Sequence, residues 1–166
     1  MIDLLKRLRL GSSERDIQAA FTDWTPLPPH PTQRAIGFLG QYEGRSVAVI
    51  CYFISRLFST KLGRAVVNLF PERPSDADAE TIHRRLKREL ASTYGRPMSD
   101  QESEVQQAPP EFRMSAMTAW MSGDAVITLA LALKRHNVGP SVPTLAVGVA
   151  DRRLDATAKI LTATAK

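Results

Sequence analysis

The feature that most constrains the fold is a set of six segments with the composition of β-strands, arranged in two groups of three. They are rich in Val, Ile, Leu, Tyr and Phe and are bounded by Gly, Pro or polar residues, which is typical of strands. In each group, the first two segments flank a short turn with a glycine, Gly44 or Gly123, which indicates a β-hairpin. The predicted strands cover residues 35–42, 45–55, 62–70, 112–121, 124–134 and 142–150.

Helical periodicity precedes each group of strands and also follows the second group. Apolar residues three or four positions apart predict an amphipathic stripe on each of these segments. Ser13 and Asp16 have the spacing of a capping box, and Ser75 or Asp76 is expected to cap the longest helix. Gly95 is expected to end that helix. The predicted helices cover residues 1–10, 13–23, 77–94 and 152–164.

The order of elements is repeated, which predicts an internal duplication. With an offset of 79 positions, Gly44 aligns with Gly123 and Ile50 aligns with Leu129, so the matched strands are expected to present their apolar residues to the same side. We therefore expect an α+β fold in which duplicated αβββ units form a six-stranded, mainly antiparallel sheet with helices packed on one face and a C-terminal helix. We expect one domain over 1–166, with a pseudo-repeat of 12–74 and 75–150 and a C-terminal helix at 151–166.

The chain is basic, and its excess charge is uneven. Its 166 residues include 22 Lys and Arg against 17 Asp and Glu, a formal net charge of +5. Most of this excess lies in residues 1–74. A basic surface favours an acidic partner, so we expect such a partner to contact the first half of the chain.

Cysteine content and hydropathy exclude several classes of protein. Cys51 is the only cysteine, so an internal disulfide and a Cys-based zinc site are both excluded. No apolar run approaches the roughly 20 residues of a membrane span. Residues 1–10 are too short and too charged for a signal peptide. We therefore expect a cytoplasmic protein without a membrane span.

The segment from Leu8 to Ile17, LRLGSSERDI, resembles the L-x-x-G-x-S-x-x-[DE]-[VI] opening of the BamE (SmpA/OmlA) outer-membrane assembly lipoproteins. The element order also looks like the tandem modules of the β-lactamase inhibitor protein, and it is similar to that of type III secretion chaperones, although those tend to be acidic. The chain departs from the lipoproteins in lacking a signal peptide and a lipidated cysteine. The resemblance implies a scaffold that holds another protein without catalysis.

No motif in the sequence predicts catalysis. His30, His83 and His136 are far apart in sequence and lack metal-ligand spacing. Cys51 lies in the middle of a predicted strand, where a packed small hydrophobe is expected rather than a reactive thiol. The chain also lacks a G-x-S-x-G motif, a P-loop and a G-x-G-x-x-G motif. We therefore expect no enzyme, no cofactor and no metal site.

The leading hypothesis is a non-enzymatic protein-binding module: an adaptor, an inhibitor or a secretion-chaperone-like scaffold. The connection at 55–63 combines apolar residues with flanking bases, which suits partner docking, although folding of these apolar residues under the sheet is an equal alternative. Trp120, a large aromatic residue at the end of a predicted hairpin, is a further candidate for exposure to a partner. The partner-binding candidates are Arg56, Leu57, Phe58, Lys61, Leu62 and Trp120.

Two other functions stay open at this point. One is nucleic-acid binding by the basic residues of the long helix, although the strands lack the interleaved basic and aromatic residues of a stacking platform. The other is binding of a small ligand in a cleft between helices and sheet. A homodimer is also left open. The nucleic-acid candidates are Arg84, Arg85, Lys87 and Arg88.

Overall fold

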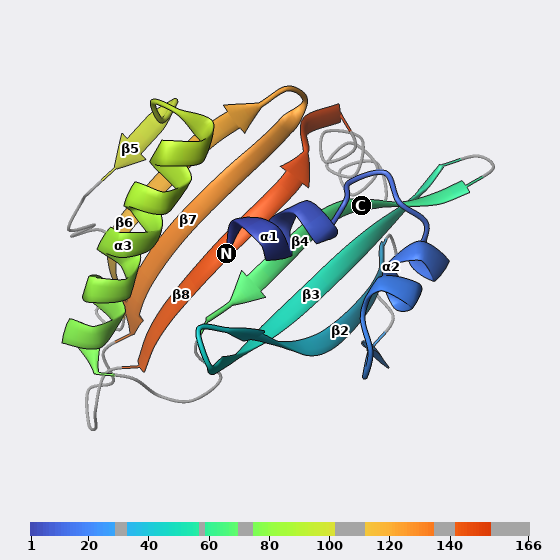
Figure 1. Ribbon diagram of the computed structural model, residues 1–166, viewed down its shortest axis with the longest axis horizontal. Helices are drawn as coiled ribbons and strands as arrows, with labels where there is room; N and C mark the ends of the chain where they lie inside the picture. The colour runs from blue at the N-terminus through green and yellow to red at the C-terminus, as the bar shows by residue number, and fades with distance from the viewer. Residues whose placement is uncertain (29–32, 57–58, 70–74, 102–111, 135–141, 154–166) are drawn as a thin grey trace.

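The computed structural model (Figure 1) describes six stretches of the chain: residues 1–28, 33–56, 59–69, 75–101, 112–134 and 142–153. Three helices and eight strands lie in these stretches. The helices are α1 (Ile2–Arg7), α2 (Glu14–Ala20) and α3 (Asp76–Tyr94). The strands are β1 (Thr25–Pro26), β2 (Gln33–Tyr42), β3 (Arg45–Arg56), β4 (Ser59–Asn68), β5 (Ser99–Gln101), β6 (Phe112–Ser122), β7 (Ala125–Lys134) and β8 (Val142–Asp151).

All the strands form one open antiparallel sheet with the order β1-β2-β3-β4-β8-β7-β6-β5. The prediction of an α+β fold with a mainly antiparallel sheet is confirmed, but the sheet has eight strands rather than six. The two additional strands are the short edge strands β1 and β5. The sequence patterns do not indicate these strands, because β1 lies in a proline-rich segment and β5 in a polar one, and neither has the apolar alternation of a buried strand.

The two hairpin turns lie where the glycines predict them. Tyr42 pairs with Arg45 across a two-residue turn in which Glu43 and Gly44 both have positive φ, 51° and 73°. This is the pattern of a type I′ turn, whose twist matches that of the flanking strands. In the second hairpin, Ser122 pairs with Ala125, and the positive φ of 60° belongs to Gly123, the first turn residue. The two glycines therefore occupy different positions of their turns.

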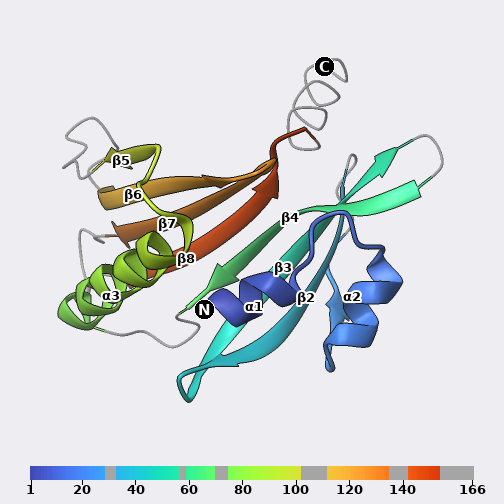
Figure 2. The same ribbon diagram turned by 45° about the horizontal axis from the view of Figure 1, so that its top comes forward.

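One face of the sheet is buried against the helices, as Figures 1 and 2 show. Alternate residues of the long strands point to this face and form one core with apolar residues of the three helices, such as Leu5, Ile17 and Leu86. Helix α3 contacts β6, β7 and β8, α2 contacts β4, and α1 contacts α3. The strand residues of the core include Ile36, Phe38, Val47, Val49, Cys51, Leu62, Ala65, Val67, Trp120, Ile127, Leu129, Leu131, Leu145 and Val147.

The helix caps form as the sequence predicts. The Ser13 side chain accepts a hydrogen bond from the Asp16 amide at 3.2 Å, and the Asp16 carboxylate accepts one from the Ser13 amide at 2.9 Å. The Ser13 hydroxyl also donates to this carboxylate at 2.7 Å, and this hydrogen bond, followed by that of the Ser13 amide, lowers the pKa of Asp16. Ser75 caps α3 in the same way by accepting from the Asp78 amide. The predicted C-terminal helix lies almost wholly outside the described residues, which end at Arg153.

The alternation of buried residues corrects the register of the predicted repeat. At an offset of 79, Ile50 was aligned with Leu129, but Leu129 lies in the core whereas Ile50 lies on the opposite face, next to the buried Val49. An offset of 80 aligns buried residues with buried residues, as in Val49 with Leu129 and Val67 with Val147. The error arose because the two turn glycines were aligned although they occupy different turn positions.

The two halves of the sheet meet at its centre, between β4 and β8. Val67 pairs with Val147, which is also its counterpart at the offset of 80. Ala65 pairs with Val149, and the Leu69 amide donates a hydrogen bond to the Leu145 carbonyl at 2.9 Å. Each strand of the first half therefore has a counterpart at the same distance from this centre.

None of the helices α1, α2 and α3 is long and apolar enough to cross a membrane.

Candidate partner-binding surface

The face of the sheet opposite the helices, here called the open face, is also largely apolar. Its residues alternate with those of the core: Ile50 and Tyr52 on β3, Val66 on β4, Ala146 on β8 and Ala130 on β7 are all half-buried. Leu39 on β2 is 69% exposed and Met121 on β6 is also exposed. In the part of the chain that the structure describes, the open face carries no helix (Figure 2).

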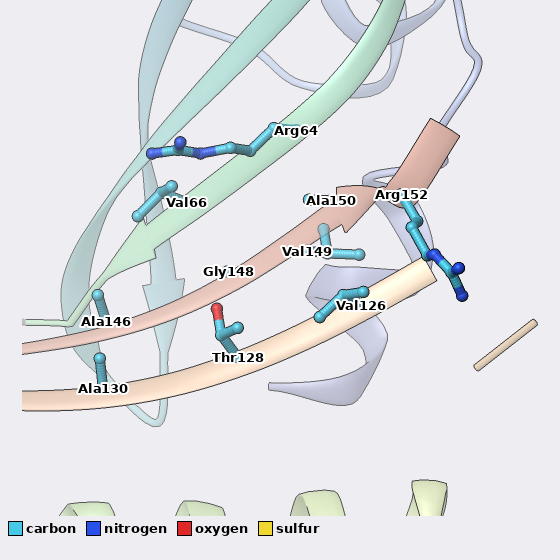
Figure 3. Close-up of a pocket in the computed structure, with 10 residues that line it drawn as sticks. All are labelled: Arg64, Val66, Val126, Thr128, Ala130, Ala146, Gly148, Val149, Ala150 and Arg152. Atoms are coloured by element: carbon cyan, nitrogen blue, oxygen red, sulfur yellow. The ribbon is translucent and has the colours of Figure 1, made fainter. Parts of the chain in front are cut away.

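The open face is hollowed over β4, β8 and β7, as Figure 3 shows. This hollow has a volume of about 590 Å³. The residues that line it are Arg64, Val66, Val126, Thr128, Ala130, Ala146, Gly148, Val149, Ala150 and Arg152.

The hollow exists because the second half of the sheet carries small residues. Ala130 on β7 is the counterpart of Ile50 on β3, and Gly148 on β8 is the counterpart of Asn68 on β4. Gly148 faces Thr128, whose hydroxyl oxygen lies only 2.6 Å from the position of a Cβ at residue 148. The Thr128 side chain therefore occupies the space that a larger residue at 148 would need. The floor of the hollow is thus built from backbone and methyl groups.

Two arginines flank the hollow, Arg64 on β4 and Arg152 just after β8 (Figure 3). The Arg64 guanidinium lies over the Tyr52 ring, 4.9 Å from its centroid, which is within the range of a cation–π interaction. Among the described residues that line the hollow there is no carboxylate. The hollow is therefore an apolar surface with positive charge at its edge.

The connection predicted to dock a partner is only partly described. Leu57 and Phe58, and the side chain of Arg56, lie outside the described residues, and Lys61 is half-buried. Leu62 is fully buried, and its backbone exchanges two hydrogen bonds of 2.8 Å with Gly11 and Ser12. The prediction that Leu62 is available to a partner is wrong, because it belongs to the core and anchors the segment between α1 and α2.

The expectation that Trp120 is exposed to a partner is also wrong. It is 0% exposed, and its indole Nε1 donates a hydrogen bond of 3.1 Å to the Gly95 carbonyl at the end of α3. The hairpin position suggested exposure, but the side chain points to the helix side of the sheet, where it fixes the end of α3 against β6.

The basic residues of α3 are not a uniform cationic stripe. Arg85 forms an ion pair with Glu43, and Lys87 forms one with Asp100 at 2.8 Å. The Lys87 hydrogen bond is the main cause that lowers the pKa of Asp100. Arg84 and Arg88 are exposed one turn apart. Half of the cationic residues assigned to nucleic-acid binding are therefore already paired with carboxylates of this chain.

Glu89 on α3 joins the two halves of the molecule. Its carboxylate accepts hydrogen bonds from the Tyr42 hydroxyl at 3.1 Å and from the Ile2 amide at 3.2 Å, and the Met1 amino group lies 3.3 Å away. Burial raises the pKa of Glu89, but the Ile2 amide, the Met1 amino group and the Tyr42 hydroxyl together outweigh it, so the pKa is lowered. Burial is the main cause that raises the pKa of Tyr42, and the nearby Glu89 charge raises it further.

We expect Glu89→Gln to destabilise the protein by about 1 kcal/mol at pH 7, a value reduced for the partial exposure of the side chain. A carboxyl with a lowered pKa in the folded state stabilises that state above its unfolded pKa of about 4.3, and the contribution is lost as the pH falls through the folded pKa. Urea denaturation of both proteins should therefore give a difference at pH 7 that shrinks at pH 3. An equal difference at both pH values would contradict this assignment.

The thiol and the histidine in the described residues are both buried. Cys51 is fully buried, as expected for a packed small side chain, and burial raises its pKa to about 12. His83 is buried on α3, while His30 and His136 lie outside the described residues. Within the described stretches, no three His, Cys, Asp or Glu side chains gather in a way that could hold a metal ion.

Sequence reasoning missed the hollow, although the sequence contains a signal for it. The open-face positions of β7 and β8 carry Thr128, Ala130, Ala146, Gly148 and Ala150 in a regular alternation with large apolar residues. The offset of 79 matched these small residues with core residues of the first half, Thr128 with Val49 and Ala146 with Val67, so it hid the contrast between the open-face residues of the two halves. Comparison with known proteins adds no further assignment, since no family model, curated protein or solved structure matches this chain significantly.

Proposed function

We propose that this protein is a non-enzymatic protein-binding module and that the hollow on the open face of its sheet is the docking surface. The observation that carries the proposal is an apolar sheet face, hollowed over β4, β8 and β7, that lies opposite a fully formed core. Contiguous exposed apolar surfaces mark interaction sites, whereas single exposed apolar residues do not.

The composition of the hollow supports docking rather than catalysis. Its polar groups are the Thr128 hydroxyl and the guanidinium groups of Arg64 and Arg152, and no carboxylate, thiol or imidazole is among its described lining residues. Such a set can contact and orient a partner but offers no base or nucleophile with a perturbed pKa.

We also propose that the fold arose by duplication of an αβββ unit extended by a short edge strand. In support, the sheet order is symmetric about the β4–β8 pair, and buried positions coincide at the offset of 80. Ser13 with Asp16 and Ser75 with Asp78 repeat the same cap at the start of α2 and α3. The two copies then diverged on the open face, where small residues in the second copy produced the hollow.

Photocrosslinking in the native host tests the docking surface. A benzoylphenylalanine at Thr144, an exposed open-face position on β8, should give a discrete adduct with a second protein. The matched control is the same residue at Ala19, which is exposed on α2 on the other side of the sheet. Equal labelling from both positions, or no adduct from Thr144 in the folded protein, would contradict the proposal.

A further inference from the structure

We propose that the hollow takes an acidic amphipathic segment of a partner protein. This inference rests on the proposed function and adds the chemistry of the partner. It is carried by two features that occur together: an apolar floor and a rim whose charged groups are both arginines.

The floor selects an apolar contact surface. Ala130, Ala146 and Gly148 leave room above the strands, and Val66 and Val126 form apolar walls beside them. A hollow of about 590 Å³ accommodates several aliphatic or aromatic side chains of one face of a peptide. Small floor residues also let a peptide backbone approach the sheet closely. The partner segment should therefore present an apolar face to β7 and β8.

The rim selects negative charge next to that apolar face. Arg64 and Arg152 are both exposed, and no described carboxylate forms a salt bridge with either. Stacking on Tyr52 orients the Arg64 guanidinium, whose N–H groups still lie in its plane and match a carboxylate. A segment with apolar side chains flanked by Asp or Glu would contact both the apolar floor and the arginines of the rim.

Charge argues against two occupants, a second copy of this chain and its residues 154–166. A second copy would bring the same open face, with its own Arg64 and Arg152, and a net charge of +5 to a positive rim. The residues that follow the described part, 154–166, contain Asp155 against Lys159 and Lys166, so their side chains are also net positive. Neither has the negative charge that the rim favours.

Selection from a displayed library of random 16-residue peptides tests this inference. The purified full chain is the target, and the double variant Ala130→Ile/Ala146→Val serves for counterselection, because it fills the hollow with the residues of its first-half counterparts, Ile50 and Val66. Enriched peptides should combine a set of apolar residues with a net negative charge. Their affinity should fall about tenfold in Arg64→Gln/Arg152→Gln.

The matched control is Arg84→Gln/Arg88→Gln, which removes the same charge from exposed positions of α3 and should change the affinity less than twofold. Neutral or basic peptides that still require the open hollow would overturn the acidic partner and leave the proposed function standing. If no peptide distinguishes the filled hollow from the open one, both proposals fail. Peptides that bind Arg64→Gln/Arg152→Gln as tightly as Arg84→Gln/Arg88→Gln would also overturn the inference.

Discussion

Replacing Trp120 with alanine should destabilise the protein by about 3–5 kcal/mol, the largest effect we expect from a single substitution. The side chain is fully buried between β6 and α3, and alanine leaves a cavity there and an unpaired Gly95 carbonyl at the end of α3. Urea denaturation followed by circular dichroism measures this change as a loss of free energy of unfolding.

Two controls separate the causes of this loss. Trp120→Phe keeps most of the buried volume but removes the indole donor, so it should cost about 1–2 kcal/mol. Met121→Ala changes the next residue, which is exposed on the open face, and should cost less than about 1 kcal/mol. A Trp120→Ala protein as stable as Met121→Ala would show that the indole does not lie in the core.

The second large effect is expected at Leu129, in the middle of β7. Leu129 is fully buried against α3, so Leu129→Ala should lower the free energy of unfolding by about 2–5 kcal/mol. Val126→Ala removes apolar volume from the open face of the same strand and should cost less than about 1 kcal/mol. Thermal and urea denaturation of the pair report which side of β7 faces the core.

The reverse order of stability for this pair would mean that the helices cover the other face of the sheet. The register found here would then be wrong by one residue, and the hollow would lie in the core. The Leu129 and Val126 substitutions therefore test which face of the sheet the helices cover.

Local patterns predicted most of the elements because each pattern has a local physical cause. The alternation in β3 and β7 reflects the period of two of a strand, and the Ser13–Asp16 pair forms its cap within one helical turn. Gly44 and Gly123 mark turns because each adopts a positive φ. These features depend on neighbours in the sequence, so they could be predicted without the tertiary structure.

Features set by long-range pairing could not be predicted in the same way. Strand β5 pairs with β6 through backbone hydrogen bonds, for which its polar side chains give no signal. Trp120 is buried because the end of α3 lies beside β6, a contact between segments 25 residues apart. The hollow depends on which side of β7 and β8 faces the helices, and a shift of one residue reverses that side.

The most direct test of the central claim is the dissociation constant of the crosslinked partner, measured by calorimetry for the wild type and for Ala130→Ile. The substitution places a β-branched residue, which suits a strand, on β7 and fills the hollow with the side chain of its counterpart Ile50. We predict an affinity at least about tenfold weaker than that of the wild type, while Ala48→Ile, on the open face outside the hollow, leaves it unchanged. Equal affinities of Ala130→Ile and the wild type would contradict the claim that the hollow is the docking surface.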